Sequence, residues 1–426
     1  MRTNRPYPKF TVYKHKFIIK DNLIVTRQFI VLTHEDGTLQ FTNFHKYVPS
    51  PLNPVRSITS DGNSRFYFVV KFLNYAFFDV GIDRLNHISV EIVRDFFQLY
   101  GMCDLPDDTD STTRKKATVE RCITSVIDFL FNLMGEQKGL CNLKRYDLYK
   151  KKSYRDKHGV VHEKNVPAFE VNYIDDYDNP IFRDMPDKAF NIIFTHILTV
   201  RKDLLGLVLN SAFAGLRPSE ACNVRRPDSP LGPGIIFEEI DGIVRLIQID
   251  LRHELNLRSD LKLVGRIKKE RLQTIPEIFV SAYVEAYKTY LKYLKGKKYE
   301  TAYAPLNVNS RGMAYTYPLY YHYFKEMIEQ DIIPLFLSNA DPELQIYGRI
   351  LQEHSISPHI FRHWFTVQLV LSGISDPYTI MYYRGDTNKD SAETYLKNKS
   401  ELEHKYQKVN DRMFDYMMWR SQKQHD

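Results

Sequence analysis

The chain has 426 residues, enough for two or three domains that each bury a core of their own. Lysine and arginine outnumber aspartate and glutamate by 59 to 52, so the net charge of +7 is a modest positive bias. No apolar run approaches the roughly 18 residues of a membrane-spanning helix, and the four cysteines show no zinc-ribbon spacing. The composition argues against a membrane protein and a disulfide-rich secreted protein, and favours the cytoplasm.

Short strands are predicted first, in a small β-rich region at residues 1–58. Its Asp36-Gly37 pair is a hairpin turn signal. From residue 59 to residue 140, apolar residues recur every three or four positions, which predicts a helical domain. Gly135 is expected to end the last of its helices.

Residues 141–178 are predicted to form a basic linker or hairpin. In the stretch 144–164 basic residues alternate with tyrosines, a combination that suits contacts with DNA phosphates and sugars. A solvated linker would have the same composition, so that alternative stays open. The residues expected to contact DNA are Lys144, Arg145, Lys150, Lys151, Lys152 and Arg155.

The largest part, residues 179–426, is predicted to be a mixed α/β domain with a C-terminal tail. Helical patterns open it, β-rich stretches follow at 234–250 and 261–276, and helical patterns resume at 279–296. The predicted fold class is therefore multidomain and mainly α with small β-sheets, a helical domain followed by a mixed α/β domain.

The stretch GLRPSE places Arg217 between Gly215, which permits a tight turn, and Pro218, which suits a first helical turn. Arg217 would then lie at a helix N-terminus, where unpaired N–H groups already favour an anion. Glu220 can hold its guanidinium in place. A purely structural ion pair would explain the same residues.

The stretch SPHIFRHWF begins another predicted helix. Ser357 is its expected N-cap, Pro358 suits the first turn, and Gly373 lies just beyond the apolar run that follows.

Two histidines flank an arginine on this helix, and the spacing of His359, Arg362 and His363 places them on one face. A zinc-protease helix has the same histidine spacing but needs glutamate where Ile360 stands. We therefore predict no metal. A buried histidine pair beside a surface arginine is the remaining alternative.

Near the C-terminus, Tyr395 follows a glycine turn. Its neighbours Glu393, Thr394, Lys397 and Asn398 are polar, which suits an accessible hydroxyl better than a core ring.

In combination, these motifs resemble the tyrosine recombinase (phage integrase) family. That family has an arginine in a GLRxSE turn, a lysine in a β-hairpin, HxxRH on a helix, His or Trp after a glycine, and a nucleophilic tyrosine nine residues later. The resemblance covers residues 180–400, and the helical residues 59–140 resemble the family's core-binding domain only in pattern. The catalytic residues it implies are Arg217, Lys268, His359, Arg362 and Tyr395, and the supporting residues are Glu220, His363 and Asp386.

The resemblance implies that Tyr395 attacks a DNA phosphodiester while Arg217 and Arg362 neutralise the phosphate. The resulting 3′-phosphotyrosyl link conserves the bond energy, so the reaction needs no cofactor. Lys268 would protonate the departing 5′ oxygen, with Lys269 as the alternative, because the sequence offers both in the predicted turn. His359 would assist proton transfer, and His363 would orient its neighbours.

Asp386 departs from the family pattern, because it stands where His or Trp would donate a hydrogen bond to the phosphate. An ionised carboxylate cannot donate. We expect it to turn away and pair with a cation such as Arg384 or Lys389.

The implied partner is double-stranded DNA, which a homo-tetramer would bind at two sites. Accessory DNA-bending proteins are possible further partners, and the expected location is the nucleoid. Two alternatives stay open. A type IB topoisomerase uses the same residue types to nick and reseal one duplex, and a catalytically silent DNA-binding protein could keep the scaffold.

Overall fold

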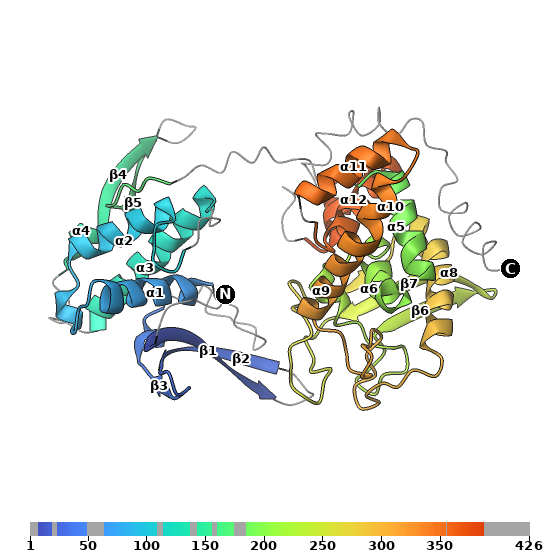
Figure 1. Ribbon diagram of the computed structural model, residues 1–426, viewed down its shortest axis with the longest axis horizontal. Helices are drawn as coiled ribbons and strands as arrows, with labels where there is room; N and C mark the ends of the chain where they lie inside the picture. Colours follow the sequence, from blue (N-terminus) through green and yellow to red (C-terminus); the bar gives the residue numbers. More distant parts are fainter. Residues whose placement is uncertain are drawn as a thin grey trace. The chain divides into compact units, whose positions relative to one another are not determined.

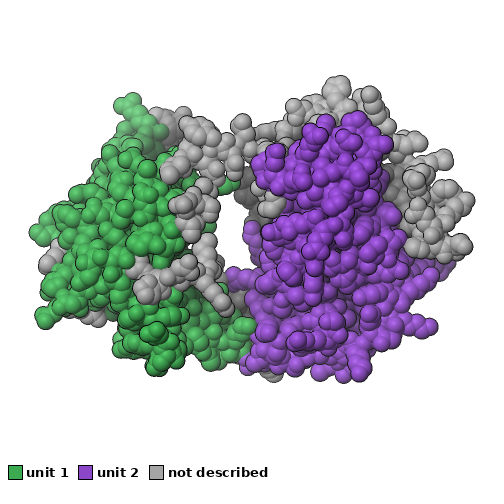
Figure 2. Space-filling model, viewed as in Figure 1, with its two compact units in different colours: residues 1–17, 25–179 green, residues 18–24, 180–426 purple. Residues whose placement is uncertain are grey.

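The computed structural model describes residues 7–18, 24–48, 64–108, 114–136, 143–155, 160–173, 185–354 and 356–386. The chain divides into two compact units, unit 1 with residues 1–17 and 25–179, and unit 2 with residues 18–24 and 180–426 (Figure 2). Each unit has its own hydrophobic core. The described part of the chain is mainly helical with small antiparallel sheets, as the sequence predicts. None of its helices is long and apolar enough to cross a bilayer.

Unit 1 combines a three-stranded sheet, a helical layer and a hairpin (Figure 1). The predicted turn at Asp36 and Gly37 is confirmed: it joins β2 to β3, and Gly37 adopts φ +84°. The elements are β1 (Lys9–Ile18), β2 (Ile24–Thr33), β3 (Leu39–Phe41), η2 (Phe44–Lys46), α1 (Arg65–Asn74), η3 (Tyr75–Asp79), η4 (Leu85–His87), α2 (Val90–Met102), α3 (Lys116–Glu136), α4 (Arg145–Leu148), β4 (Tyr149–Arg155) and β5 (Val161–Pro167).

Helix α3 corrects one local prediction, because it runs through Gly135 to Glu136. Gly135 is not among the glycines with positive φ. A glycine ends a helix by adopting the left-handed conformation, so Gly135 does not act as the predicted stop.

The sheet and the helices of unit 1 share one core. Phe10 of β1 and Ile30 of β2 belong to the same buried cluster as the helical residues. The buried Asn74 side chain accepts from the Phe10 backbone N–H at 2.8 Å and donates to the Phe10 carbonyl at 3.0 Å. Leu148, just before the β4–β5 hairpin, is also fully buried in this core. The sheet within the predicted 1–58 region therefore packs on the helices and has no separate core.

Unit 2 combines a three-stranded antiparallel sheet, in the order β6-β7-β8, with a larger set of helices (Figure 1). Its elements are α5 (Asp187–Thr199), α6 (Lys202–Ala212), α7 (Pro218–Ala221), β6 (Ile235–Ile240), β7 (Ile243–Leu251), β8 (Arg271–Thr274), α8 (Glu277–Leu294), α9 (Tyr317–Met327), η5 (Ile328–Ile332), α10 (Ile333–Leu337), α11 (Pro342–Glu353), α12 (Ile360–Leu371) and α13 (Pro377–Arg384).

Helix α12 runs through the core of unit 2. Its Trp364 is fully buried and stacks on Phe190 of α5 with ring centroids 3.6 Å apart. The indole N–H donates to Asp187 Oδ1 at 2.9 Å, so the polar edge of the ring is also satisfied. This packing fixes the rotation of α12, and with it the direction in which His359, Arg362 and His363 project.

Candidate active site

The turn before α7 positions Arg217. Gly215 has φ +65°, and a Cβ there would lie 2.4 Å from the Phe365 ring, so only glycine fits. Arg217 is the N-cap of α7. Its Nη1 donates to Glu220 Oε1 at 3.0 Å, and its backbone N–H donates to Oε2 at 3.1 Å. The predicted contact between Glu220 and the Arg217 guanidinium is therefore present.

Glu220 binds a second arginine that the sequence did not point to. It is fully buried and accepts from Arg271 Nη2 of β8 at 2.9 Å and from the Lys268 backbone N–H at 3.3 Å. Burial by itself would raise the pKa of Glu220, but the hydrogen bond from Arg271 and the nearby arginine charges bring that pKa below its ordinary value. An ionised Glu220 therefore ties α7 to the segment that carries the candidate lysines.

Helix α12 starts later than predicted. The Ile360 N–H donates to the Ser357 carbonyl at 3.0 Å, and His359 occupies the N-cap. Ser357 is therefore not the cap, because a tight turn through Pro358 comes before the helix. The predicted stop is confirmed, since Gly373 follows the helix with φ +96°.

Arg362 is only 1% exposed, which excludes the alternative of a surface arginine. Its Nη1 donates to the carbonyls of Gly215 and Arg384, and its Nη2 donates to Asp386 Oδ1 at 2.7 Å. Burial and the charges of Arg384 and Arg217 lower the pKa of Arg362 to about 9, so it stays charged at neutral pH. Its Nε is buried and has no acceptor among the described residues.

Asp386 lies between the two predicted arginines. Its Oδ1 accepts from Arg217 Nη2 at 2.5 Å and from Arg362 Nη2 at 2.7 Å, while its Oδ2 accepts from Arg384 Nε at 2.7 Å. The predicted pairing with Arg384 is confirmed, but the prediction that the carboxylate turns away is wrong. Two guanidinium groups that converge in a buried place attract the nearest anion. Lys389 lies outside the described residues.

The charge state of Asp386 follows from these neighbours. Burial by itself would raise the pKa of this carboxyl, but Arg362, Arg384 and Arg217 bring the pKa below its ordinary value. Asp386 is therefore ionised at neutral pH and cannot donate a hydrogen bond to a phosphate.

His359 and His363 share one face of the segment, as predicted, with ring centroids 5.8 Å apart. Burial, together with the charges of Arg362, Arg217 and Arg384, lowers the pKa of His359 to about 4. His359 is therefore neutral at pH 7. Within the described ranges, no group of three or more His, Cys, Asp or Glu side chains is arranged to hold a metal ion.

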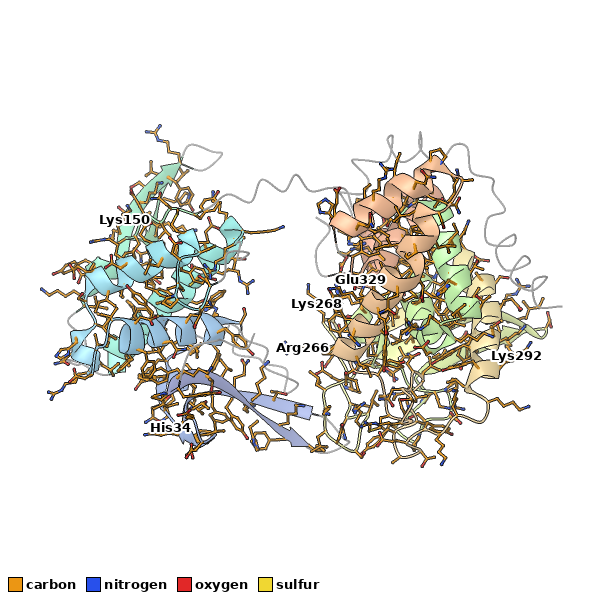
Figure 3. The ribbon with its side chains drawn as sticks, viewed as in Figure 1. His34, Lys150, Arg266, Lys268, Lys292 and Glu329 are labelled. Carbon is orange, nitrogen blue, oxygen red and sulfur yellow. The ribbon has the colours of Figure 1, made fainter. Side chains whose placement is uncertain are left out.

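The two candidate lysines differ in their surroundings. Arg217, Arg271, Arg362 and Arg384 form an arginine cluster around Glu220 and Asp386. Lys269 Nζ donates to the Asp386 carbonyl at 3.1 Å, so this side chain reaches the arginine cluster. The side chain of Lys268, the preferred candidate, is exposed at the edge of unit 2 (Figure 3). Its Nζ makes no hydrogen bond or ion pair with any described residue. Tyr395 lies outside the described residues, so the candidate nucleophile is not placed.

The basic segment of unit 1 is an antiparallel hairpin in which Lys152 pairs with Lys164. The side chains of Lys144, Lys150, Lys151, Lys152 and Arg155 are exposed, and Figure 3 shows Lys150 on β4. Lys151 contacts Glu163 at 3.0 Å and Lys150 contacts Glu170 at 3.3 Å. The side chain of Arg145 lies outside the described residues.

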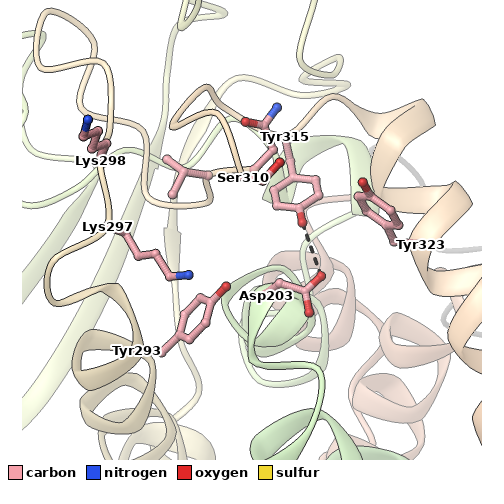
Figure 4. Close-up of a pocket in the computed structure, with 9 residues that line it drawn as sticks. Asp203, Tyr293, Lys297, Lys298, Ser310, Tyr315 and Tyr323 are labelled. Atoms are coloured by element: carbon pink, nitrogen blue, oxygen red, sulfur yellow. Dashed lines mark hydrogen bonds between the residues drawn. The ribbon is translucent and has the colours of Figure 1, made fainter.

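Unit 2 also has a hollow of about 250 Å³ that none of the predicted site residues lines (Figure 4). In it, Tyr315 donates to Asp203 Oδ2 at 3.3 Å, and the same carboxylate accepts from Arg201. The Asp203 carboxylate in this hollow thus has partners of its own.

No protein-family model and no curated protein matches the chain. Among solved structures, the fold is similar to the XerH site-specific recombinase bound to difH substrate, with a TM-score of 0.40 and 14% identity, over 78% of this chain and 73% of that chain. The Tn1549 transposon integrase with transposon right end DNA gives a TM-score of 0.45 and 15% identity, over 87% and 95%. A lambda integrase tetramer bound to a Holliday junction gives 0.39 and 10%, over 90% and 95%. With TM-scores below 0.5 and identities of 15% or less, these similarities support no conclusion about the activity of this chain.

Proposed function

We propose that this protein is a tyrosine-type site-specific DNA recombinase, which cleaves and rejoins DNA through a 3′-phosphotyrosyl link to Tyr395. One observation carries the proposal: Arg217 and Arg362 point their Nη2 groups at a single oxygen of Asp386. Two guanidinium groups fixed around one oxygen anion suit a phosphodiester, whose charge grows on its non-bridging oxygens during attack.

The neighbouring groups supply the proton chemistry. The Tyr395 phenol, with an ordinary pKa of about 10, has to lose its proton as it attacks. His359, which is neutral at pH 7, would assist the proton transfer. The Lys268 side chain is exposed, whereas the Lys269 amine is engaged with the Asp386 carbonyl. We assign Lys268 as the general acid, with Lys269 as the alternative.

The partner in this proposal is double-stranded DNA. The exposed lysines of the β4–β5 hairpin would neutralise backbone phosphates, with no base readout required. Exchange of strands between two DNA sites would require a homo-tetramer, which accessory DNA-bending proteins could assist. A nicking and resealing enzyme that acts on one duplex would use the same chemistry.

A catalytically silent DNA-binding protein is the second candidate, and Asp386 favours it. Its carboxylate contacts both arginines and would repel a phosphate that approached them. The two candidates differ in whether a covalent adduct forms.

A pool of nicked duplexes with randomised sequence tests the proposal, because loss of the short strand beyond the nick prevents religation. We expect wild-type protein to form denaturation-resistant adducts, and sequencing of the recovered DNA would identify the site. Tyr395→Phe should form none and should retain DNA binding. Tyr378→Phe, which changes an exposed tyrosine of α13, is the matched control. Adducts that persist in Tyr395→Phe would disprove the nucleophile assignment, and their absence from wild type would favour the silent protein.

A further inference from the structure

The donors of the two arginines divide into two groups. Arg362 Nη1 is bound by backbone carbonyls, and Arg217 Nη1 is bound by Glu220. These contacts hold each guanidinium to the framework of unit 2. Of the remaining donors, the two Nη2 groups both bind Asp386 Oδ1, and the buried Nε of Arg362 has no acceptor among the described residues.

A phosphodiester would need the same two Nη2 groups. A carboxylate oxygen and a non-bridging phosphate oxygen are similar hydrogen-bond acceptors, and both carry negative charge. Resting on the proposed function, we propose that Asp386 is an internal substitute for the scissile phosphate, which closes the arginine site until DNA displaces it.

The Arg362 Nε without an acceptor favours the interpretation that Asp386 stands in for a phosphate, over the interpretation that it forms a permanent structural ion pair. Asp386 Oδ1 serves two donors, and Oδ2 is directed to Arg384, so the carboxylate leaves the third donor without an acceptor. A buried donor without a partner costs free energy. A tetrahedral phosphate presents an additional oxygen, which would satisfy this Nε and compensate for displacement of Asp386.

Asp386 retains a partner after displacement. Arg384 binds its Oδ2 at 2.7 Å and is itself anchored by Thr366 Oγ1 on α12. Gly385, at φ +59°, immediately precedes Asp386. The carboxylate is thus able to release Oδ1 and keep Oδ2 on Arg384, which avoids an unpaired buried charge.

The charge balance also permits exchange. Four arginines, Arg217, Arg271, Arg362 and Arg384, surround the two carboxylates Glu220 and Asp386. The cluster therefore stays positive with Asp386 in place and still attracts a phosphate. An isolated anion has to compete with Asp386, whereas duplex DNA adds its other contacts to the displacement.

The test is the affinity of the full-length protein for inorganic sulfate, measured by calorimetry without DNA. Asp386→Asn keeps the size of the side chain and removes its charge. We expect it to bind sulfate at least tenfold more tightly than wild type, a difference of about 1.4 kcal/mol. The gain should disappear in Asp386→Asn combined with Arg217→Gln. Equal affinity in wild type and Asp386→Asn, or a gain that survives Arg217→Gln, would overturn the proposal.

Asp250→Asn is the matched control, because the Asp250 carboxylate is also shared by two arginines, Arg225 and Arg252. It should not reproduce a gain that depends on Arg217. If Asp386→Asn does not fold, Asp386→Ser takes its place with the same expected result.

Sulfate binding does not require cleavage. If Asp386→Asn binds sulfate more tightly but the wild-type protein forms no covalent adducts, the recombinase proposal is rejected and the blocked anion site is retained. If adducts form but sulfate affinity does not rise, the recombinase proposal is retained and the blocked anion site is rejected.

Discussion

The arginine cluster of unit 2 and the lysine hairpin of unit 1 are both basic in sequence, yet they differ in the folded protein. The Arg362 side chain is 1% exposed, whereas the Lys151 side chain is 75% exposed. Arg362 donates to two backbone carbonyls and to a carboxylate, while Lys151 has a single surface ion pair. The basic side chains of the two regions therefore differ in how deeply they are buried and in how many partners they have, and not in the sign of their charge.

This difference predicts different roles. Buried charges are costly unless fixed partners satisfy them, and fixed donors stabilise a transition state with little reorganisation. Exposed lysines contribute little through surface ion pairs and act on DNA through counterion release, which depends on salt. Substitutions in the cluster should therefore change the rate of cleavage, and substitutions in the hairpin should change affinity.

The largest expected effect is that of Arg217→Ala or Arg362→Ala. Each removes one of the two donors aimed at the phosphate and should cost on the order of 3 kcal/mol in the chemical step, a hundredfold or more in rate. The rate of adduct formation at saturating DNA measures it. Arg225→Ala is the control, because Arg225 is a buried arginine paired with Asp250 outside the cluster. It should lower stability and leave the rate of the folded protein unchanged. Near-normal rates in either cluster variant would remove that arginine from the site.

A smaller effect distinguishes the two lysines. Lys268→Ala should slow cleavage by about a hundredfold, because the 5′ oxygen then leaves without a proton donor. Replacement of that bridging oxygen by sulfur should abolish the defect, since a thiolate leaves without protonation. Lys269→Ala should show little defect and no such rescue. Rescue of Lys269→Ala alone would transfer the role to Lys269.

His359 should make stability depend on pH. Its folded-state pKa of about 4 lies below the ordinary histidine value, so the unfolded chain binds the proton more readily. The contribution of neutral His359 to the free energy of unfolding is fully present above about pH 6.5. It is lost as the pH falls to about 4 and does not change further at lower pH. Because the ring is partly exposed, we expect on the order of 2 kcal/mol. Urea unfolding of wild type and His359→Gln should show a stability difference that changes across this window. A constant difference would contradict the burial of neutral His359.

The hairpin should produce the smallest effect on the reaction itself. Replacement of Lys150, Lys151 and Lys152 by alanine should weaken DNA binding and reduce its salt dependence by up to about three ions. The rate of adduct formation at saturating DNA should not change. The measurement is the slope of the logarithm of DNA affinity against the logarithm of salt concentration.

Three exposed lysines provide a control of equal charge in unit 2: Lys288 and Lys292 of α8, and Lys295 directly after it. Their replacement by alanine should leave the salt slope closer to wild type. An equal loss of slope in both triple variants would show that the hairpin acts only through net charge.

The sequence by itself determined the local features of this protein. The contact of Arg217 with Glu220 and the shared face of His359 and His363 depend on residues at most four positions apart. Backbone geometry fixes such relations, and residue types and spacing reveal them. The alternation of helical and β-rich stretches likewise predicted a mainly helical protein with small sheets.

Only the tertiary structure decided the contacts of Asp386. Its partner Arg217 lies 169 residues away in the chain, and Arg271 reaches Glu220 from β8, 51 residues away. No local spacing encodes these distances, because they depend on how α7, β8, α12 and α13 pack around one core. The sequence predicted an ionised Asp386 paired with Arg384, but packing placed its second oxygen between two arginines that the family resemblance had assigned to a phosphate.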